Sequence, residues 1–173
     1  MKLEGLIRSV PDFPISGILF RDITPLLREP AALRVAIDRM AAGWEGRGID
    51  LVAAMEARGF IFGTGIAYRL GAGFVPVRKE GRLPWRTRSA RYELEYRADV
   101  LHVHEDAVTP GQRVLVVDDL IATGGTAKAV VELVEGLGGT VVGLGFLIEL
   151  AGLAGRRLLD RYEVQSLIVF EGD

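Results

Sequence analysis

The chain has 173 residues, 49% of them apolar and 25% charged, which is the balance of an ordinary globular protein long enough to bury one full core. The formal net charge of −2 argues against a nucleic-acid partner, and the lack of cysteine excludes disulfides, thiolate catalysis and zinc sites built on cysteine. From the length we expect a single domain over residues 1–173. Charged residues interrupt the apolar residues at the N-terminus, unlike in a signal peptide, and no apolar run reaches the length of a membrane span, so we expect a cytoplasmic location with no membrane partner.

Two further features of the composition concern the source of the protein. Asparagine is absent, glutamine occurs only at Gln112 and Gln165, and lysine occurs only at Lys2, Lys79 and Lys128 against many arginines. Loss of thermolabile side chains is typical of proteins from thermophiles, although a preference for arginine over lysine also follows the base composition of a genome. We therefore expect a thermophilic source.

The first part of the chain predicts a short helix followed by an arm. Leu3, Leu6 and Ile7 recur at helical spacing and need a surface to pack on. Residues 11–25 then contain three prolines and one glycine, yet they are too apolar for a solvated linker. We expect them to form an irregular arm that packs over another part of the molecule.

The middle of the chain alternates between helical patterns and short apolar runs. A helix is indicated before Gly46 and Gly48, and residues 51–55 and 74–77 read as buried strands on either side of a second helix within residues 60–70. The first helix has its apolar residues at Leu33, Ile37, Met40, Ala41 and Trp44, and we expect Trp44 to lie in the core.

Residues 78–97 differ in character from the rest. They hold seven cations but only three acids, together with Gly81 and Pro84, which predicts a mobile loop. Residues 92–96 and 100–104 look like a hairpin that closes this loop. His102 and His104 share one strand face, which we interpret as a solvated face rather than a metal site, because no third ligand is evident.

Residues 114–127 combine four features in order. Four apolar residues indicate a strand buried on both faces, Asp118 and Asp119 follow where that strand should end, and a Thr-Gly-Gly-Thr run then opens a helix. Glycines let backbone amides converge on an anion, and a helix N-terminus adds partial positive charge. The acids can accept hydrogen bonds from sugar hydroxyls, so the stretch predicts a site for a phosphorylated sugar.

The rest of the chain completes an α/β pattern. A helix over residues 127–137, a strand over 141–150, a helical segment over 153–159 and a strand over 167–170 are expected. Strand–loop–helix units with polar residues after the strands predict a mostly parallel central sheet flanked by helices, with ligands bound beyond the carboxyl ends of the strands.

Residues 114–127 resemble the motif by which type I phosphoribosyltransferases bind 5-phosphoribosyl 1-pyrophosphate (PRPP). Competing phosphate motifs fit worse. The chain has no Gly-x-x-x-x-Gly-Lys-[Ser/Thr] sequence, and Gly63-Thr-Gly65 lacks the third glycine of a dinucleotide fingerprint. Residues 17–22, 56–60, 77–84 and 92–96 are similar to segments of the adenine branch of this family, so the similarity runs through nearly the whole chain.

The resemblance implies the type I fold with an N-terminal hood and a flexible β-hairpin lid. It also implies a reaction in which adenine and PRPP give AMP and pyrophosphate, with Mg²⁺ held by substrate oxygens and water, so that no protein ligand for the metal is named. A homodimer is expected, with the partner bordering each site.

The resemblance also assigns residues to parts of the substrates. Glu95 matches the catalytic glutamate that exchanges a proton with the base, and Tyr96 helps to close the lid. A non-proline cis peptide is expected in the turn formed by residues 56–59. The ribose would be bound by Asp118 and Asp119, the 5′-phosphate by Ala122, Thr123, Gly124, Gly125 and Thr126, pyrophosphate by Arg58, Lys79 and Arg82, and adenine by Leu19, Phe20, Arg21 and Leu150.

Alternatives stay open at this point. Phe20 also fits a plain core aromatic and Glu95 an exposed strand acid, and Trp85 and Arg97 depart from the family pattern in the lid. A transferase for guanine, hypoxanthine, xanthine or another 6-substituted purine is possible within the enzyme class, although residues 147–150 lack the lysine that oxopurine enzymes commonly use. A PRPP-sensing regulator without catalysis fits less well, since the chain shows no basic face and no added DNA-binding module.

Overall fold

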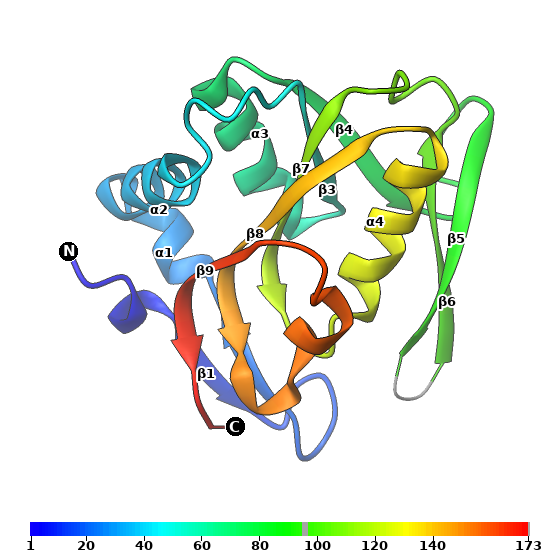
Figure 1. Cartoon of the computed structure of the whole chain (residues 1–173). Helices are drawn as coiled ribbons and strands as arrows, with labels where there is room; N and C mark the ends of the chain where they lie inside the picture. Colours follow the sequence, from blue (N-terminus) through cyan, green and yellow to red (C-terminus); the bar gives the residue numbers. More distant parts are fainter. Residues whose placement is uncertain (95–96, 173) are drawn as a thin grey trace.

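A seven-stranded sheet runs through the middle of the computed structural model, which describes residues 1–94 and 97–172 (Figure 1). The strand order is β5-β6-β4-β3-β7-β8-β9. Neighbours from β4 to β9 pair in parallel, whereas β6 is antiparallel to both β4 and β5. The strands are β3 (Leu51–Met55), β4 (Gly73–Lys79), β5 (Thr87–Leu94), β6 (Arg97–His104), β7 (Arg113–Ile121), β8 (Thr140–Leu150) and β9 (Val164–Phe170).

Helices cover both faces of this sheet, which confirms the expected α/β fold. Helices α2 (Pro30–Ala42) and α3 (Arg58–Leu70) lie on one face and α4 (Gly125–Gly136) on the other (Figure 1). In β7, Val114 and Val116 pack toward α4, while Leu115 and Val117 pack toward α2 and α3. All four side chains are fully buried, as the unbroken apolar run predicts.

Trp44 lies in the core, as expected. It follows the end of α2 and is 1% exposed. Its indole ring covers β8 at Gly143, where any Cβ would overlap the ring. Gly145 also faces the indole, so glycine in β8 makes room for the largest side chain of the core.

The N-terminal arm is more regular than predicted. The expected short helix is reduced to one 3₁₀ turn, Glu4–Leu6, because the chain is already extended at Ile7. Leu3 is buried, and Leu6 and Ile7 pack against the core. β1 (Arg8–Pro11) and β2 (Leu19–Asp22) then pair as a small antiparallel sheet, and α1 (Thr24–Arg28) follows. This small sheet lies beside the carboxyl ends of β8 and β9 (Figure 1).

Three other expectations need correction, the first two because pairing with another strand extends an element. The cation-rich run is mostly strand rather than loop, since β5 pairs with β6 along its whole length. β7 continues through both acids to Ile121, because β8 pairs with it that far. The segment expected as a helix is a pair of 3₁₀ turns, Ala151–Leu153 and Gly155–Leu159. Among the described residues no helix is both long enough and apolar enough to cross a bilayer.

Candidate active site

The carboxyl ends of the parallel strands meet at one edge of the sheet, where Figure 1 shows the arrowheads of β7, β8 and β9. A cavity of about 220 Å³ opens there. It is lined by Arg58, Asp118, Asp119, Leu120, Ile121, Ala122, Thr123, Gly124, Thr126, Ala127 and Phe146. The cavity thus brings together the acid pair, four of the five predicted phosphate residues and the arginine that begins α3.

The acid pair is held in a low-dielectric position. Asp119 is 3% exposed and Asp118 is half-buried, and the Asp118 Oδ1 atom accepts a hydrogen bond of 2.8 Å from the Asp119 backbone N–H. Burial, with the charge of Asp119 added, raises the pKa of Asp118 well above its usual range. Burial also raises the pKa of Asp119, although the charge of Arg58 opposes that rise.

Gly59 makes the close approach of α3 to this pair possible. A Cβ at Gly59 would lie 2.7 Å from Asp118 Oδ1, so a larger residue would displace the carboxylate. Its neighbour Arg58 places Nε 2.8 Å from Asp119 Oδ2. The expected cis peptide is present between Glu56 and Ala57, in the turn that leads into these two residues.

The predicted phosphate loop ends at the N-terminus of α4. Gly124 is the N-cap, with a φ of +84° that favours glycine, and it makes no side-chain capping bond. The first backbone N–H groups of a helix lack intrahelical partners, and the helix dipole adds partial positive charge there. Because Gly124 and Thr126 line the cavity, this end of α4 offers donors to an anion bound in it.

The arm contributes Phe20 from β2. The Phe20 ring centre lies 5.1 Å from the Arg58 guanidinium and 5.1 Å from the ring of Phe13, which meets it edge-on. Arg58 therefore stands between an aromatic ring of the arm and an acid of β7. Phe20 is half-buried at the site edge rather than a plain core aromatic.

The other predicted adenine residues are distributed around this edge. Leu19 begins β2 and pairs with Pro11, the last residue of β1. The side chain of Arg21 contacts β9, with its guanidinium 4.0 Å from the Phe170 ring centre and a 2.6 Å hydrogen bond to Ser9 Oγ. Leu150 is half-buried and ends β8.

Lys79 and Arg82 do not line the cavity. Lys79 ends β4, where its Nζ atom lies 3.4 Å from Asp99 Oδ2, and its backbone N–H donates to Glu56 at 2.6 Å. Arg78 binds the other oxygen of Glu56 at 3.0 Å and the carbonyl oxygen of Arg82 at 3.0 Å. Burial would raise the pKa of Glu56, but these hydrogen bonds outweigh it and lower that pKa. Sequence reasoning missed Glu56 as the anchor of the cationic segment.

The lid residues Glu95 and Tyr96 lie outside the described residues. In the loop before β5, Trp85 is 53% exposed and its ring meets His104 edge-on at 6.2 Å. His102 and His104 are half-buried rather than solvated, and the His102 Nδ1 atom lies 3.0 Å from Thr87 Oγ1.

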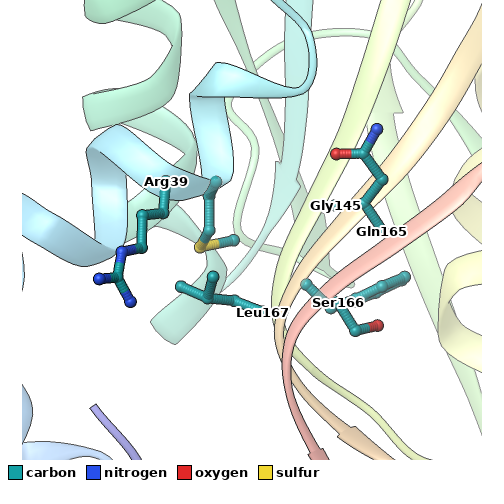
Figure 2. Close-up of a pocket in the computed structure, with 7 residues that line it drawn as sticks. Arg39, Gly145, Gln165, Ser166 and Leu167 are labelled. Carbon is teal, nitrogen blue, oxygen red and sulfur yellow. The ribbon is translucent and has the colours of Figure 1, made fainter. Parts of the chain in front are cut away.

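A second, smaller cavity of about 70 Å³ lies between α2 and the strands β8 and β9. Figure 2 shows Leu167 projecting from β9 toward α2, where Arg39 borders the space. None of the residues predicted to bind substrate lines this cavity, and it holds no carboxylate. The cavity that contains the acid pair at the strand ends is therefore the candidate active site.

Comparison with known proteins agrees with this geometry. The profile of the phosphoribosyl transferase domain matches residues 26–172. The adenine phosphoribosyltransferase of Thermotoga petrophila is 57% identical over 98% of this chain and 100% of its own length. The crystal structure of the enzyme of that name from Thermoanaerobacter pseudethanolicus superposes with a TM-score of 0.95 at 56% identity, covering 97% of this chain and 98% of the other.

A third relative was solved with ligands. The adenine phosphoribosyltransferase of Saccharomyces cerevisiae, complexed with an imino-altritol bisphosphate and adenine, is 41% identical, with a TM-score of 0.90 and coverage of 95% of this chain and 96% of the other.

Proposed function

Since the chain belongs to the phosphoribosyltransferase family, and within it to the adenine phosphoribosyltransferases, we propose that it transfers the phosphoribosyl group of PRPP to adenine, giving AMP and pyrophosphate in purine salvage. The observation that carries the proposal is the cavity in which Asp118, Asp119 and the N-terminus of α4 converge. A sugar that bears a phosphate needs both kinds of group a few ångströms apart, and the yeast relative was solved with adenine bound.

In the proposed complex the carboxylates of Asp118 and Asp119 accept hydrogen bonds from the ribose hydroxyls. The backbone N–H groups of residues 122–126 hold the 5′-phosphate, as the helix dipole favours an anion there. Both groups of contacts lie on strand ends and a helix start, so they fix the ribose ring while C1′ is attacked.

Departure of pyrophosphate leaves an oxocarbenium-like centre at C1′, and the leaving polyanion needs cations. Arg58 borders the ribose contacts, and Lys79 and Arg82 belong to the segment anchored by Glu56. We assign these three side chains to pyrophosphate, with Arg58 exchanging Asp119 for the phosphate oxygens.

Adenine is assigned to the space beside the arm. Phe20 would stack on one face and Leu150 on the other, while backbone groups near Leu19 and Arg21 read the polar edge. Glu95 would exchange a proton with the base when the lid closes, and Tyr96 would help to exclude water.

Mg²⁺ is the proposed metal. It prefers oxygen ligands, keeps several waters and usually binds through substrate phosphates with at most one or two carboxylates. The ion is proposed to enter with PRPP and to be held by its oxygens and water, so no protein ligand is named. When bound, the ion would neutralise charge on the departing pyrophosphate.

Incubation with PRPP, Mg²⁺ and each purine base in turn, followed by nucleotide detection, tests the function. We expect AMP from adenine and little product from guanine, hypoxanthine or xanthine. Product from an oxopurine alone would assign the chain to a different base. Binding of PRPP without any nucleotide formed would favour a regulator.

Three further properties are proposed with the function. The exposed apolar side chains of the arm, Phe13, Ile15 and Ile18, support a homodimer, which light scattering tests directly because monomer mass at working concentration would contradict it. A cytoplasmic location suits charged, phosphorylated substrates. A thermophilic source is supported by the composition and tested by a melting temperature well above 65 °C, the upper end for ordinary mesophilic domains.

A further inference from the structure

The phosphate loop, residues 122–126, is not held in shape by its own side chains. Its N-cap residue Gly124 has no side chain that could cap α4, and Lys128 N donates to the Gly124 carbonyl as part of α4 rather than across the loop. Binding of a phosphate by backbone N–H groups depends on their direction. A support from outside the loop is therefore needed to keep those groups converging.

Gly155 supplies such a support from the 3₁₀ turn Gly155–Leu159, which lies between β8 and β9 in the chain. A Cβ at Gly155 would overlap the carbonyl oxygen of Ala122 and would lie 2.9 Å from the backbone nitrogen of Gly124. A Cβ at Gly124 would in turn overlap the carbonyl oxygen of Gly155. Two backbones thus lie in direct contact with no side chain between them, so a shift of Gly155 must shift the loop.

The 3₁₀ turn that begins at Gly155 is held by the next residue. Arg156 donates from Nε to Glu149 Oε1 at 2.6 Å and from the terminal nitrogen Nη2 to Glu149 Oε2 at 2.7 Å. Nη1 donates to the Val164 carbonyl oxygen at 2.6 Å, and Nη2 also reaches Ser166 Oγ at 3.3 Å. The guanidinium therefore joins the turn to β8 and β9 through all three of its nitrogens.

The partner of Arg156 is itself fixed close to the loop. Glu149 is 7% exposed and pairs in the β7–β8 register with Ile121, the residue before the loop. Hydrogen bonds from Arg156 outweigh burial and lower the pKa of Glu149, and the same bonds raise the pKa of Arg156. Both side chains thus stay ionised at working pH, and a bidentate pair of this kind fixes geometry as well as charge.

We propose that Glu149 and Arg156 are a positioning pair for the 5′-phosphate subsite, holding Gly155 against residues 122–124 so that the loop keeps its backbone donors aimed at the phosphate. Neither side chain lines the cavity, so the pair acts through the backbone contact rather than on the substrate. The inference rests on the proposed function for the identity of the ligand, but the contact chain from Glu149 to Gly124 does not depend on it.

The test compares two ligands that differ in the relevant group. Ribose 5-phosphate carries the 5′-phosphate, whereas pyrophosphate binds at the other end of the site, and calorimetry with Mg²⁺ measures each separately. For Arg156→Lys, which keeps the charge but loses the fork, we expect ribose 5-phosphate to bind at least tenfold more weakly and pyrophosphate to change less than twofold. In turnover, KM for PRPP should rise while kcat stays within about threefold.

Two more variants keep the test sound if a buried charge left alone prevents folding. Glu149→Met combined with Arg156→Met removes both charges and should show the same selective loss. Gly155→Ala leaves the ion pair in place and presses on Ala122 directly, so it should weaken ribose 5-phosphate binding as well.

Matched controls separate positioning from general loss of structure. Arg47→Met breaks another arginine–glutamate fork, Arg47 with Glu163, outside the cavity lining, and Gly5→Ala adds a Cβ that meets nothing within 4 Å. Both should bind the two ligands as wild type does. Unchanged ribose 5-phosphate affinity in the folded Arg156→Lys and Gly155→Ala variants overturns the inference, as does an equal loss for both ligands. If the wild-type protein makes no AMP but the variants still lose ribose 5-phosphate affinity selectively, only the proposed function is overturned.

Discussion

Arg58 places its Nε atom 2.8 Å from Asp119 Oδ2 while its guanidinium stands 5.1 Å from the ring centre of Phe20. One side chain at the start of α3 therefore contacts both the acid pair and the arm. It compensates the charge of a carboxylate that is only 5% exposed in its side chain. Ribose hydroxyls bound to Asp119 would replace this contact, which frees Arg58 for pyrophosphate.

Arg58→Met tests this exchange. Charge-assisted hydrogen bonds contribute about 1.5–3 kcal/mol, so pyrophosphate should bind on the order of 10- to 100-fold more weakly. Arg58 also lowers the pKa of Asp119, so PRPP affinity in the variant should begin to fall at a higher pH than in wild type as the solution is acidified. Arg69→Met is the control, because Arg69 lies on the same helix but pairs with Asp38 and Glu45. Pyrophosphate affinity equal to that of wild type would remove Arg58 from this subsite.

Asp118→Asn together with Asp119→Asn tests the ribose contacts. Neutral amides accept weaker hydrogen bonds from hydroxyls than carboxylates do, so KM for PRPP should rise and turnover should fall. Steady-state kinetics with adenine in excess measures both. Full activity in the double variant would mean that the two acids are only structural.

Asp118→Asn alone tests whether folding raises the pKa of Asp118. An aspartate whose pKa is raised by folding stabilises the fold below its unfolded pKa, and that contribution is lost as the pH rises through the folded value. The asparagine variant has no such proton but keeps the acceptor for the Asp119 N–H. The melting temperature of the variant, relative to that of wild type at the same pH, should therefore increase as the pH rises above the ordinary pKa range of aspartate. A difference that does not change with pH would argue against a raised pKa.

Glu95→Gln and Glu95→Leu test the proposed proton transfer. General acid–base groups typically contribute 10²- to 10⁴-fold, roughly 3 to 5 kcal/mol of barrier. Glutamine cannot exchange the proton, so turnover should fall within that range, and leucine should cost at least as much. The dissociation constant for PRPP, measured without adenine, should stay within a few-fold of wild type. Collapse of PRPP binding with turnover preserved at saturation would place Glu95 in the ground-state pocket instead.

Gly143→Ala tests the packing of Trp44. The added methyl would overlap the fully buried indole ring of Trp44. The strand that carries Gly143, β8, cannot move away because it is paired on both sides, with β7 and β9. Overpacking of a core costs about 1–3 kcal/mol, which urea denaturation resolves. Gly172→Ala, whose Cβ would meet nothing within 4 Å, should change stability little. Equal stability of the two variants would show that Trp44 can repack.

The sequence alone determined the features that depend on neighbouring residues. The unbroken apolar run at 114–117 predicts burial on both faces, and the acids and glycines that follow predict a sugar-phosphate site, because strand pattern, turn chemistry and helix start are local. The burial prediction is confirmed in β7, and Asp119 and the N-cap Gly124 line the same cavity. Binding of a sugar phosphate there stays a prediction. The resemblance carried by the same residues led to the family.

Only the tertiary structure decided which distant groups meet. Nothing in the local pattern shows that Gly155 touches Gly124, that Arg156 joins Glu149 to β9, or that Arg58 reaches Asp119. The same holds for the arm, whose proline-rich sequence predicted an irregular segment although β1 pairs with β2. It also holds for Asp118 and Asp119, which are part of β7 because β8 pairs with β7 beyond them. Buried backbone groups and buried charges must find partners among the residues that the fold brings near them. For residues far apart in the chain, sequence spacing does not indicate which of them will be in contact.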